Sequence, residues 1–188
     1  MILKRILLLL LCTVYLCGCS SGQQEIDIAH KLRSDILSAE GCSFTAAITA
    51  DYGDELYEFA LQCAFDKTGA LSFRVLKPDT ISGITGKISR DEGALTFDDQ
   101  VLAFKKLTDG QITPVTAPWL LIKAVREGYI AACGKDQNGY RLQLDDSYEE
   151  DLLTVDVWLN ADGTITHGEF LWDGRRILSI DVKDFAYL

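Results

Sequence analysis

The sequence has few of the residues that usually carry catalysis or metal binding. It contains only two histidines, His30 and His167, among 188 residues. Neither has a serine, cysteine or acidic residue at the spacing of a nucleophile or metal motif. The acidic run from Asp145 to Asp151 lacks the alternating ligands and the central glycine of a calcium loop, and it is more typical of a solvated connection between strands. We therefore expect no enzyme active site, no metal site and no cofactor.

Positive charge is scarce as well. The chain has 18 Lys and Arg residues against 28 Asp and Glu residues, and its formal net charge at pH 7 is −10. No stretch gathers basic residues into a stripe. Affinity for nucleic acid comes mostly from Lys and Arg side chains that neutralise phosphates, so this composition disfavours nucleic-acid binding. For the same reason, electrostatic attraction alone would not hold this protein on an anionic membrane.

A long hydrophobic run is missing too. The apolar segment Ile6–Leu16 has eleven residues, whereas a membrane-spanning helix needs about 20. It follows Lys4 and Arg5, and a basic start before a short apolar run is the layout of a secretory signal. The run ends in Leu16-Cys17-Gly18-Cys19, which resembles the bacterial lipobox. In a lipobox the last cysteine is lipidated and becomes the first residue of the mature protein, so we expect a signal peptide over residues 1–18 and lipid attachment at Cys19.

The crowding of three of the six cysteines into this region is explained by the same interpretation. Cys12 and Cys17 leave with the signal peptide, so the cluster is not a metal or redox site. A diacylglyceryl group at Cys19, with palmitate-like chains, holds a protein on a bilayer through two acyl chains. Residues 19–24 are small and polar and are expected to form a lipidated tether. The sequence thus predicts a protein on the extracytoplasmic face of the cell membrane.

The remaining residues, 25–188, have a length that suits a single domain. Apolar residues recur at helical spacing from Glu25 to Ala39, which predicts an amphipathic helix. The later chain alternates with period two and is divided by turn pairs such as Asn138-Gly139, which is typical of an antiparallel meander. The stretch from Thr116 to Gly128 interrupts this pattern with a cap residue, an early proline, an apolar body and a terminal glycine, so we expect an inserted helix there.

The first hairpin allows a prediction of register. A two-residue turn at Tyr52-Gly53 would make Cys42 face Cys63 and would place the apolar residues of both strands on one face. Directly opposed cysteines in a non-hydrogen-bonded pair lie close enough for a disulfide, and a compartment outside the cytoplasm permits one. A disulfide between Cys42 and Cys63 is therefore one interpretation. The other is a pair of buried thiols that act as small hydrophobic residues.

The glycines between Thr80 and Ile88 fall inside a strand pattern and indicate a bulge or a sharp curl of the sheet. We expect an α+β fold with a strongly curled antiparallel sheet, an incomplete β-barrel, and with the two helices packed on its concave side. Such a sheet could form a groove under the inserted helix. The side chains expected to line this groove are Phe59, Phe73, Trp119 and Leu121, and ordinary core packing is the alternative for each of them.

The order of these elements resembles a known fold. An N-terminal helix, a long hairpin, a meander through "LSFRVLKPDTISGITGKI" and "ALTFDDQVLAFKK", a helical insertion "APWLLIKAVREG" and closing hairpins are similar to the LolA/LolB-like fold, an incomplete antiparallel barrel wrapped over helices. The phrase Val75-Leu76-Lys77-Pro78-Asp79 followed by Ile81-Ser82-Gly83-Ile84 is similar to a pattern of small clostridial-type LolA-like lipoproteins, the GerS-related group. The resemblance implies a single LolA/LolB-like domain over residues 25–188.

Two functions follow from this resemblance. In Gram-negative members the groove shields acyl chains of lipoproteins in transit, which implies an acyl-chain ligand. GerS-like members are regarded as partners that support a cell-wall enzyme, which implies a protein partner in the cell envelope. We expect a lipid-anchored, non-catalytic interaction or scaffold protein in envelope or spore-wall processes, with lipid binding or lipoprotein carriage as the alternative.

Overall fold

The structure is a computed structural model that describes residues 21–51, 53, 56–90, 93–97, 100–104, 113–137, 139–145 and 153–188. The predicted signal peptide, Cys19 and most of the acidic run lie outside these residues. In the part of the chain that the structure describes, no helix is both long enough and apolar enough to cross a membrane.

The described chain contains two α-helices, one short 3-10 helix and eleven strands. Helix α2 comes first, α3 lies between β6 and β7, and the strands run in two consecutive series before and after α3. The elements are α2 (Ser21–Ser38), β1 (Gly41–Asp51), β2 (Leu56–Asp66), β3 (Leu71–Lys77), η1 (Asp79–Ile81), β4 (Thr85–Ile88), β5 (Gly93–Phe97), β6 (Gln100–Phe104), α3 (Ala117–Glu127), β7 (Tyr129–Asp136), β8 (Gly139–Asp145), β9 (Leu153–Asn160), β10 (Ile165–Trp172) and β11 (Arg175–Tyr187).

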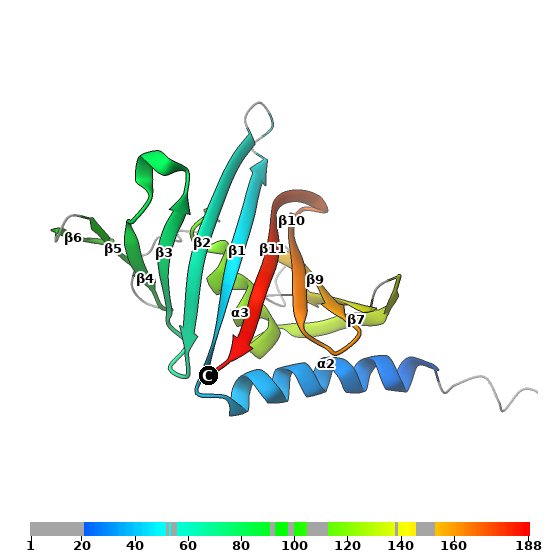
Figure 1. Ribbon diagram of the computed structural model, residues 1–188. Coiled ribbons are helices and arrows are strands. Elements are labelled where there is room, and N and C mark those ends of the chain that lie inside the picture. The colour runs from blue at the N-terminus through cyan, green and yellow to red at the C-terminus, as the bar shows by residue number, and fades with distance from the viewer. Residues whose placement is uncertain are drawn as a thin grey trace, which may run out of the picture.

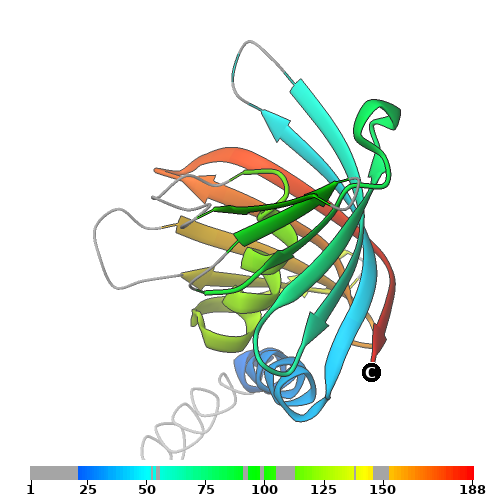
Figure 2. The same ribbon diagram turned by 90° about the vertical axis from the view of Figure 1, so that its left-hand side faces the viewer.

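All eleven strands form one antiparallel sheet in the order β6-β5-β4-β3-β2-β1-β11-β10-β9-β8-β7. Each series is a meander, and the two series join where the first strand pairs with the last, from Cys42 opposite Tyr187 to Ala50 opposite Leu178. The sheet curls strongly but stays open, with β6 and β7 at its two ends (Figures 1 and 2). The prediction of an α+β fold with a curled, unclosed antiparallel sheet is confirmed.

Helix α3 lies against the concave side of the curl and contacts β2, β8, β9 and β11 (Figure 2). We call the face that α3 contacts the inner face and the opposite one the outer face. Thr116 precedes α3 and Gly128 follows it, as the sequence predicts. Eight of its eleven residues are buried, because the helix packs against these four strands and against helix α2 (Ser21–Ser38). Its Leu121 is fully buried and reaches Gly168 of β10.

Helix α2 runs along one end of the curl and contacts β7 and α3 (Figure 1). It begins at Ser21, four residues before the predicted start at Glu25, so part of the stretch expected as a tether is helical. The glutamines in this stretch are good helix formers, which explains the extension. The buried stripe of the helix consists of Ala29, Leu32 and Ile36.

The core lies between the inner face and the two helices. Residues alternate in burial along the central strands, so that every second side chain of β1, from Cys42 to Ala50, is buried. This period of two is what the sequence pattern predicts. The largest fully buried side chains come from both series of strands and from α3: Ile48, Leu61, Leu71, Leu121, Ile122, Leu142, Leu144, Ile165, Phe170, Leu178 and Ile180.

The predicted register of the first hairpin is wrong by two residues. Cys42 lies opposite Phe65, and Cys63 lies opposite Phe44. The reason is the connection, because β1 ends at Asp51 and β2 begins at Leu56, which leaves four residues between the strands instead of two. A shift of two residues preserves the faces, so the apolar set still points inward.

The segment with the glycines also differs from the expected strand. Residues Asp79–Ile81 form η1, and β4 begins only at Thr85. Gly83 has a φ of +92°, a conformation that favours glycine, and its amide donates to the carbonyl oxygen of Val75 at 2.9 Å. The glycine therefore turns the chain back onto β3 instead of bending a long strand.

Candidate functional site

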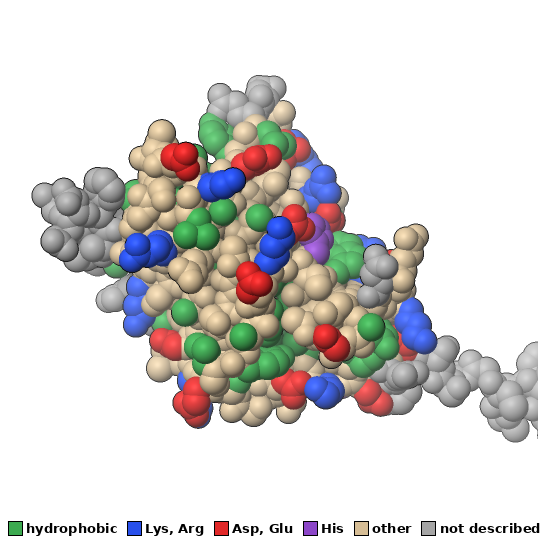
Figure 3. All heavy atoms as spheres, viewed as in Figure 1, with side chains coloured by type: hydrophobic (Ala, Val, Ile, Leu, Met, Phe, Trp, Pro, Cys, Tyr) green, Lys and Arg blue, Asp and Glu red, His purple; other side chains and the backbone are tan. Residues whose placement is uncertain are grey.

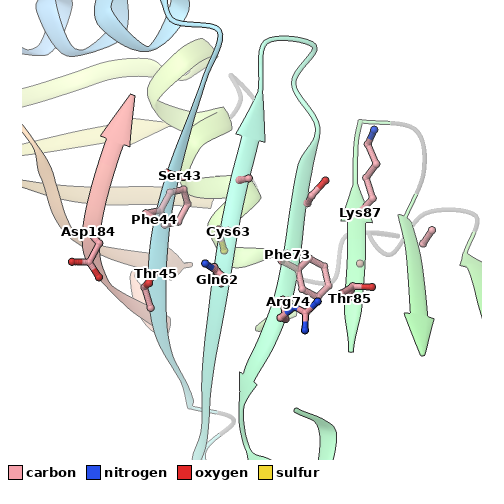
Figure 4. Close-up of a pocket in the computed structure, with 14 residues that line it drawn as sticks. Ser43, Phe44, Thr45, Gln62, Cys63, Phe73, Arg74, Thr85, Lys87 and Asp184 are labelled. Carbon is pink, nitrogen blue, oxygen red and sulfur yellow. The ribbon is translucent and has the colours of Figure 1, made fainter. Parts of the chain in front are cut away.

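A hollow of about 680 Å³ opens on the outer face of the sheet (Figure 4). Its exposed side chains come from outer-face positions of the strands, whereas the inner-face residues that border it are buried beneath it. The volume lies in the range of about 300–1,000 Å³ that is usual for ligand sites. The residues that line the hollow are Ser43, Phe44, Thr45, Gln62, Cys63, Ala64, Ser72, Phe73, Arg74, Thr85, Gly86, Lys87, Ala94 and Asp184.

Four short side chains and one lysine form a row that crosses the strands along the hollow. Ser43 pairs with Ala64, Ala64 with Ser72, and Lys87 of the same row pairs with Ala94. The neighbouring row carries longer side chains, and it includes Gln62 opposite Arg74. Side chains of one row share a face of the sheet because residues opposite each other in register point the same way. The short side chains of the first row, beside the longer Gln62 and Arg74 of the second, leave the space above them open.

A β-bulge shapes the end of the hollow at β11. Ser43 pairs with Ala186 and Thr45 with Lys183, so two residues of β11, Asp184 and Phe185, lie opposite one residue of β1. Asp184 has a φ of +54° and lines the hollow with its exposed side chain. The ring of Phe185 stacks on that of the buried Phe44, with 5.9 Å between the ring centroids.

The other end of the hollow carries two cations, Arg74 on β3 and Lys87 on β4 (Figure 4). Among the described residues neither of them forms an ion pair, whereas Lys31, Lys67 and Arg90 each pair with a carboxylate at 2.5–2.7 Å. The pair therefore leaves a local positive charge on a chain whose net charge is −10.

The charge of Lys87 acts on the carboxyl group of Asp66. Its pKa lies below the usual value, first because the Thr68 hydroxyl donates to it and last because of the charge of Lys87. The Oδ1 atom of Asp66 accepts bonds from the Thr68 hydroxyl at 2.5 Å and from the Ala70 amide at 3.0 Å. Asp66 is thus engaged in its own turn and does not pair directly with Lys87.

The hollow offers polar groups beside its two cations. Gln62, Ser72 and Thr85 place an amide and two hydroxyl groups beside the two cations. Together these groups can hold a polar or anionic group of a ligand. No set of three or more His, Cys, Asp and Glu residues within the described ranges could hold a metal ion.

The side chains predicted to line an apolar groove are packed in the core. Phe73, Trp119 and Leu121 are buried members of one hydrophobic cluster, and the partly buried Phe59 packs against it. Trp119 also donates from Nε1 to the carbonyl oxygen of Gly69 at 3.0 Å, which fastens α3 to the turn between β2 and β3. The predicted lipid site, Cys19, lies outside the described residues.

The predicted disulfide residues are both free thiols in the structure. Cys42 and Cys63 are buried, and they occupy diagonal positions of the hairpin instead of opposite ones. Burial raises the pKa of Cys42 to about 12, and it raises the pKa of Cys63 further. This arrangement corresponds to the second interpretation of the sequence, a pair of small buried hydrophobic residues.

Several polar contacts have no counterpart in the sequence analysis. His167 Nδ1 lies 2.7 Å from Asp181 Oδ1, and Arg141 donates to the buried Asp156. These partners, like Arg74 and Lys87, lie on neighbouring strands and are brought together only by the register. Period-two alternation signals that such residues share a face, but the register is needed to say which of them meet.

Comparisons with known proteins show likeness in fold. No protein-family model matches the sequence, and no curated protein matches it. A DUF1329 family protein from Desulfovibrio piger is similar in structure at a TM-score of 0.50, with 10% identity over 89% of this chain and 93% of that one. A LolA superfamily protein from Nitrosomonas europaea has a TM-score of 0.48, with 9% identity over 89% and 93%. The lipoprotein LppX from Mycobacterium tuberculosis has a TM-score of 0.44, with 8% identity over 86% and 93%.

At these identities the likeness concerns the fold alone. The DUF1329 family protein, at a TM-score of 0.50, shares the overall fold of this chain, and the LolA-like fold that the sequence resemblance implies stays a prediction. The narrower likeness to the GerS-related group stays a prediction, and the function has to be argued from the site.

Proposed function

We propose that the protein is a non-catalytic, lipid-anchored binding protein of the cell envelope that holds a partner or ligand in the hollow on its outer face. The observation that carries this proposal is the open hollow itself, with Arg74 and Lys87 left without an ion pair among the described residues. A scaffold role in envelope or spore-wall assembly is the form of this function that the sequence resemblance favours.

The anchor belongs to the same proposal. A basic start, a short apolar run and the sequence Leu16-Cys17-Gly18-Cys19 support lipid attachment at Cys19. Helix α2 begins at Ser21, only two residues after that cysteine. An anchor at Cys19 would therefore connect to the domain through a helix instead of a long flexible tether, and the domain would stand close to the extracytoplasmic face of the membrane.

Site-specific photo-cross-linking in intact cells tests whether the hollow is the binding site. A photoreactive amino acid replaces Ala64 or Ser72, which both line the hollow, and in the control it replaces Gln143, an exposed residue of β8. Illumination should give a product of defined mass at the two hollow positions and none at Gln143. A second substitution, Ala64→Trp, fills the hollow and should abolish the product formed at position 72.

The mass of the product separates the alternatives. A product larger by the mass of a protein supports the scaffold role, whereas an addition of lipid size supports the acyl-chain role. Equal products at all three positions, or a product at position 72 that survives Ala64→Trp in a folded protein, would show that the hollow is not the site.

A further inference from the structure

We infer that the end of the hollow formed by Arg74 and Lys87 binds a phosphate group of the ligand. This inference rests on the proposed function, because it names the chemistry that the same site recognises. It is carried by the relative position of the two cations, by the absence of a carboxylate that pairs with them among the described residues, and by the hydroxyl and amide groups around them.

The register places the two cations on neighbouring strands, and their side chains extend in different directions along the sheet (Figure 4). Arg74 lies opposite Thr85, and Lys87 lies opposite Ser72, so the two cations occupy diagonal positions on the outer face of β3 and β4. Diagonal neighbours are about 7–8 Å apart at their Cα atoms, a separation that long side chains can bridge. Both side chains are long and exposed, so a change of rotamer can bring the guanidinium group and the ammonium group to one small anion from two sides.

The other charge of the hollow is too distant to neutralise this pair. Asp184 lies on β11, and β1 and β2 separate it from β3. At about 4.8 Å per strand, it stands about 14 Å from Arg74 and about 19 Å from Lys87 across the sheet. These separations exceed the Debye length of about 8 Å at physiological ionic strength. Asp184 therefore does little to neutralise the two cations, and the Asp66 carboxylate, on which the charge of Lys87 acts, forms no ion pair with either of them.

The neighbouring groups suit a phosphate oxygen better than an apolar group. Ser72 and Thr85 each offer a hydroxyl donor, and Gln62, opposite Arg74, offers an amide donor. Arginine can donate two parallel hydrogen bonds to a phosphate, and lysine adds a point charge. The short side chains of Ala64 and Ala94 leave room for the rest of the ligand along the row.

Titration calorimetry on the full chain purified in detergent tests the inference. Inorganic phosphate is the first probe, in a buffer without other oxyanions and at constant ionic strength. Arg74→Gln and Lys87→Gln should each raise the Kd about tenfold, since each removes one charged hydrogen-bond donor. The double variant should show no saturable binding. The matched control is Lys135→Gln, which removes an exposed lysine of β7 far from the hollow and should leave the Kd unchanged.

The second probe distinguishes two sources of phosphate. Glycerophosphoglycerol, a lipid headgroup without acyl chains, carries a phosphodiester. Binding of both probes, lost in the double variant, indicates a headgroup or another diester ligand, whereas binding of inorganic phosphate alone indicates a free phosphate. If neither probe binds, or if all variants bind alike, the inference is wrong. In that case, cross-linking at position 72 that persists in the Arg74→Gln/Lys87→Gln variant would show that the hollow is still the binding site. If the protein without these two substitutions gives no cross-link specific to the hollow, the proposed function is wrong as well.

Discussion

Arg33 in α2 donates a hydrogen bond from Nε to the carbonyl oxygen of Val125 in α3, at 2.7 Å. Its Nη2 donates to the carbonyl oxygen of Gly128 at 2.5 Å. The last carbonyls of a helix have no partner within the helix, so one guanidinium group satisfies the end of α3 and ties α2 to it. Burial lowers the pKa of Arg33, and its position between two carbonyl oxygens is the interaction that offsets this cost.

We predict that Arg33→Met loosens the two helices from each other. Two carbonyl oxygens lose a charged donor while the aliphatic packing is largely kept, so the free energy of unfolding should fall by about 2–3 kcal/mol. Urea denaturation followed by circular dichroism measures this loss. Lys31→Met is the control, because Lys31 is an exposed residue of the same helix whose ion pair with Asp35 contributes little. Equal losses in the two variants would contradict the role of Arg33.

A second prediction concerns the contact between α3 and the sheet. A Cβ atom at Gly168 would lie 2.8 Å from Leu121 Cδ1 and 3.0 Å from Ile180 Cγ2. Gly168→Ala should therefore lower the free energy of unfolding by about 1–3 kcal/mol through overpacking. Adding Leu121→Ala to this variant opens space at the same point. The loss of unfolding free energy in the double variant should therefore be smaller than the sum of the losses in the two single variants. Strict additivity in the double-mutant cycle would place Leu121 elsewhere.

These two contacts show what sequence reasoning could reach. The period of the apolar residues, with Thr116 before it and Gly128 after it, predicted the bounds of α3 correctly. The Thr116 hydroxyl does not cap the helix, however, but donates to the carbonyl oxygen of Thr113 at 2.8 Å. The same pattern predicted which face of the first hairpin is buried. It could not predict that Arg33 would meet Val125, since this contact depends on how two helices separated by six strands pack together.

The errors have a physical cause in the connections. Side-chain alternation fixes a strand's face but is unchanged by a shift of two residues, so it could not separate a two-residue turn from the four-residue connection between Asp51 and Leu56. The hollow was missed for a related reason. Arg74 and Lys87 are thirteen residues apart in sequence, and only the register of β3 with β4 makes them neighbours.

A third prediction concerns the state of the hairpin cysteines. Cys42 and Cys63 are buried thiols with raised pKa values, so they should not react with iodoacetamide in the folded protein at pH 8. In denaturant without a reducing agent both should be alkylated, as peptide mass spectrometry would show. Alkylation that requires prior reduction would instead reveal the disulfide expected from the sequence.

A fourth prediction, a loss of stability at high pH, follows from the raised pKa values of the same two thiols. Burial raises the pKa of Cys42 to about 12 in the folded protein, whereas the usual value is 9.0. The unfolded chain therefore loses these protons first, so the stabilisation is complete below pH 9 and declines as the pH rises from 9 toward 12. The free energy of unfolding should fall by up to about 1.4 kcal/mol per pH unit for each thiol. Denaturation midpoints between pH 8 and pH 11 should fall less steeply in the Cys42→Ala/Cys63→Ala variant, and identical slopes would contradict this origin.

The last prediction concerns the lipid anchor proposed at Cys19. Cys19→Ala should abolish incorporation of labelled palmitate and should block cleavage before residue 19, because lipidation directs that cleavage. Cys17→Ala is the matched control, since alanine is also small enough for this position of a lipobox, and it should leave labelling and cleavage intact. Labelling of the membrane fraction in a bacterial host, with mass spectrometry of the N-terminal peptide, measures both effects. If the Cys19→Ala variant is still labelled, the two-chain anchor is not at this cysteine. The proposal that α2 lies next to the membrane would then lose its basis.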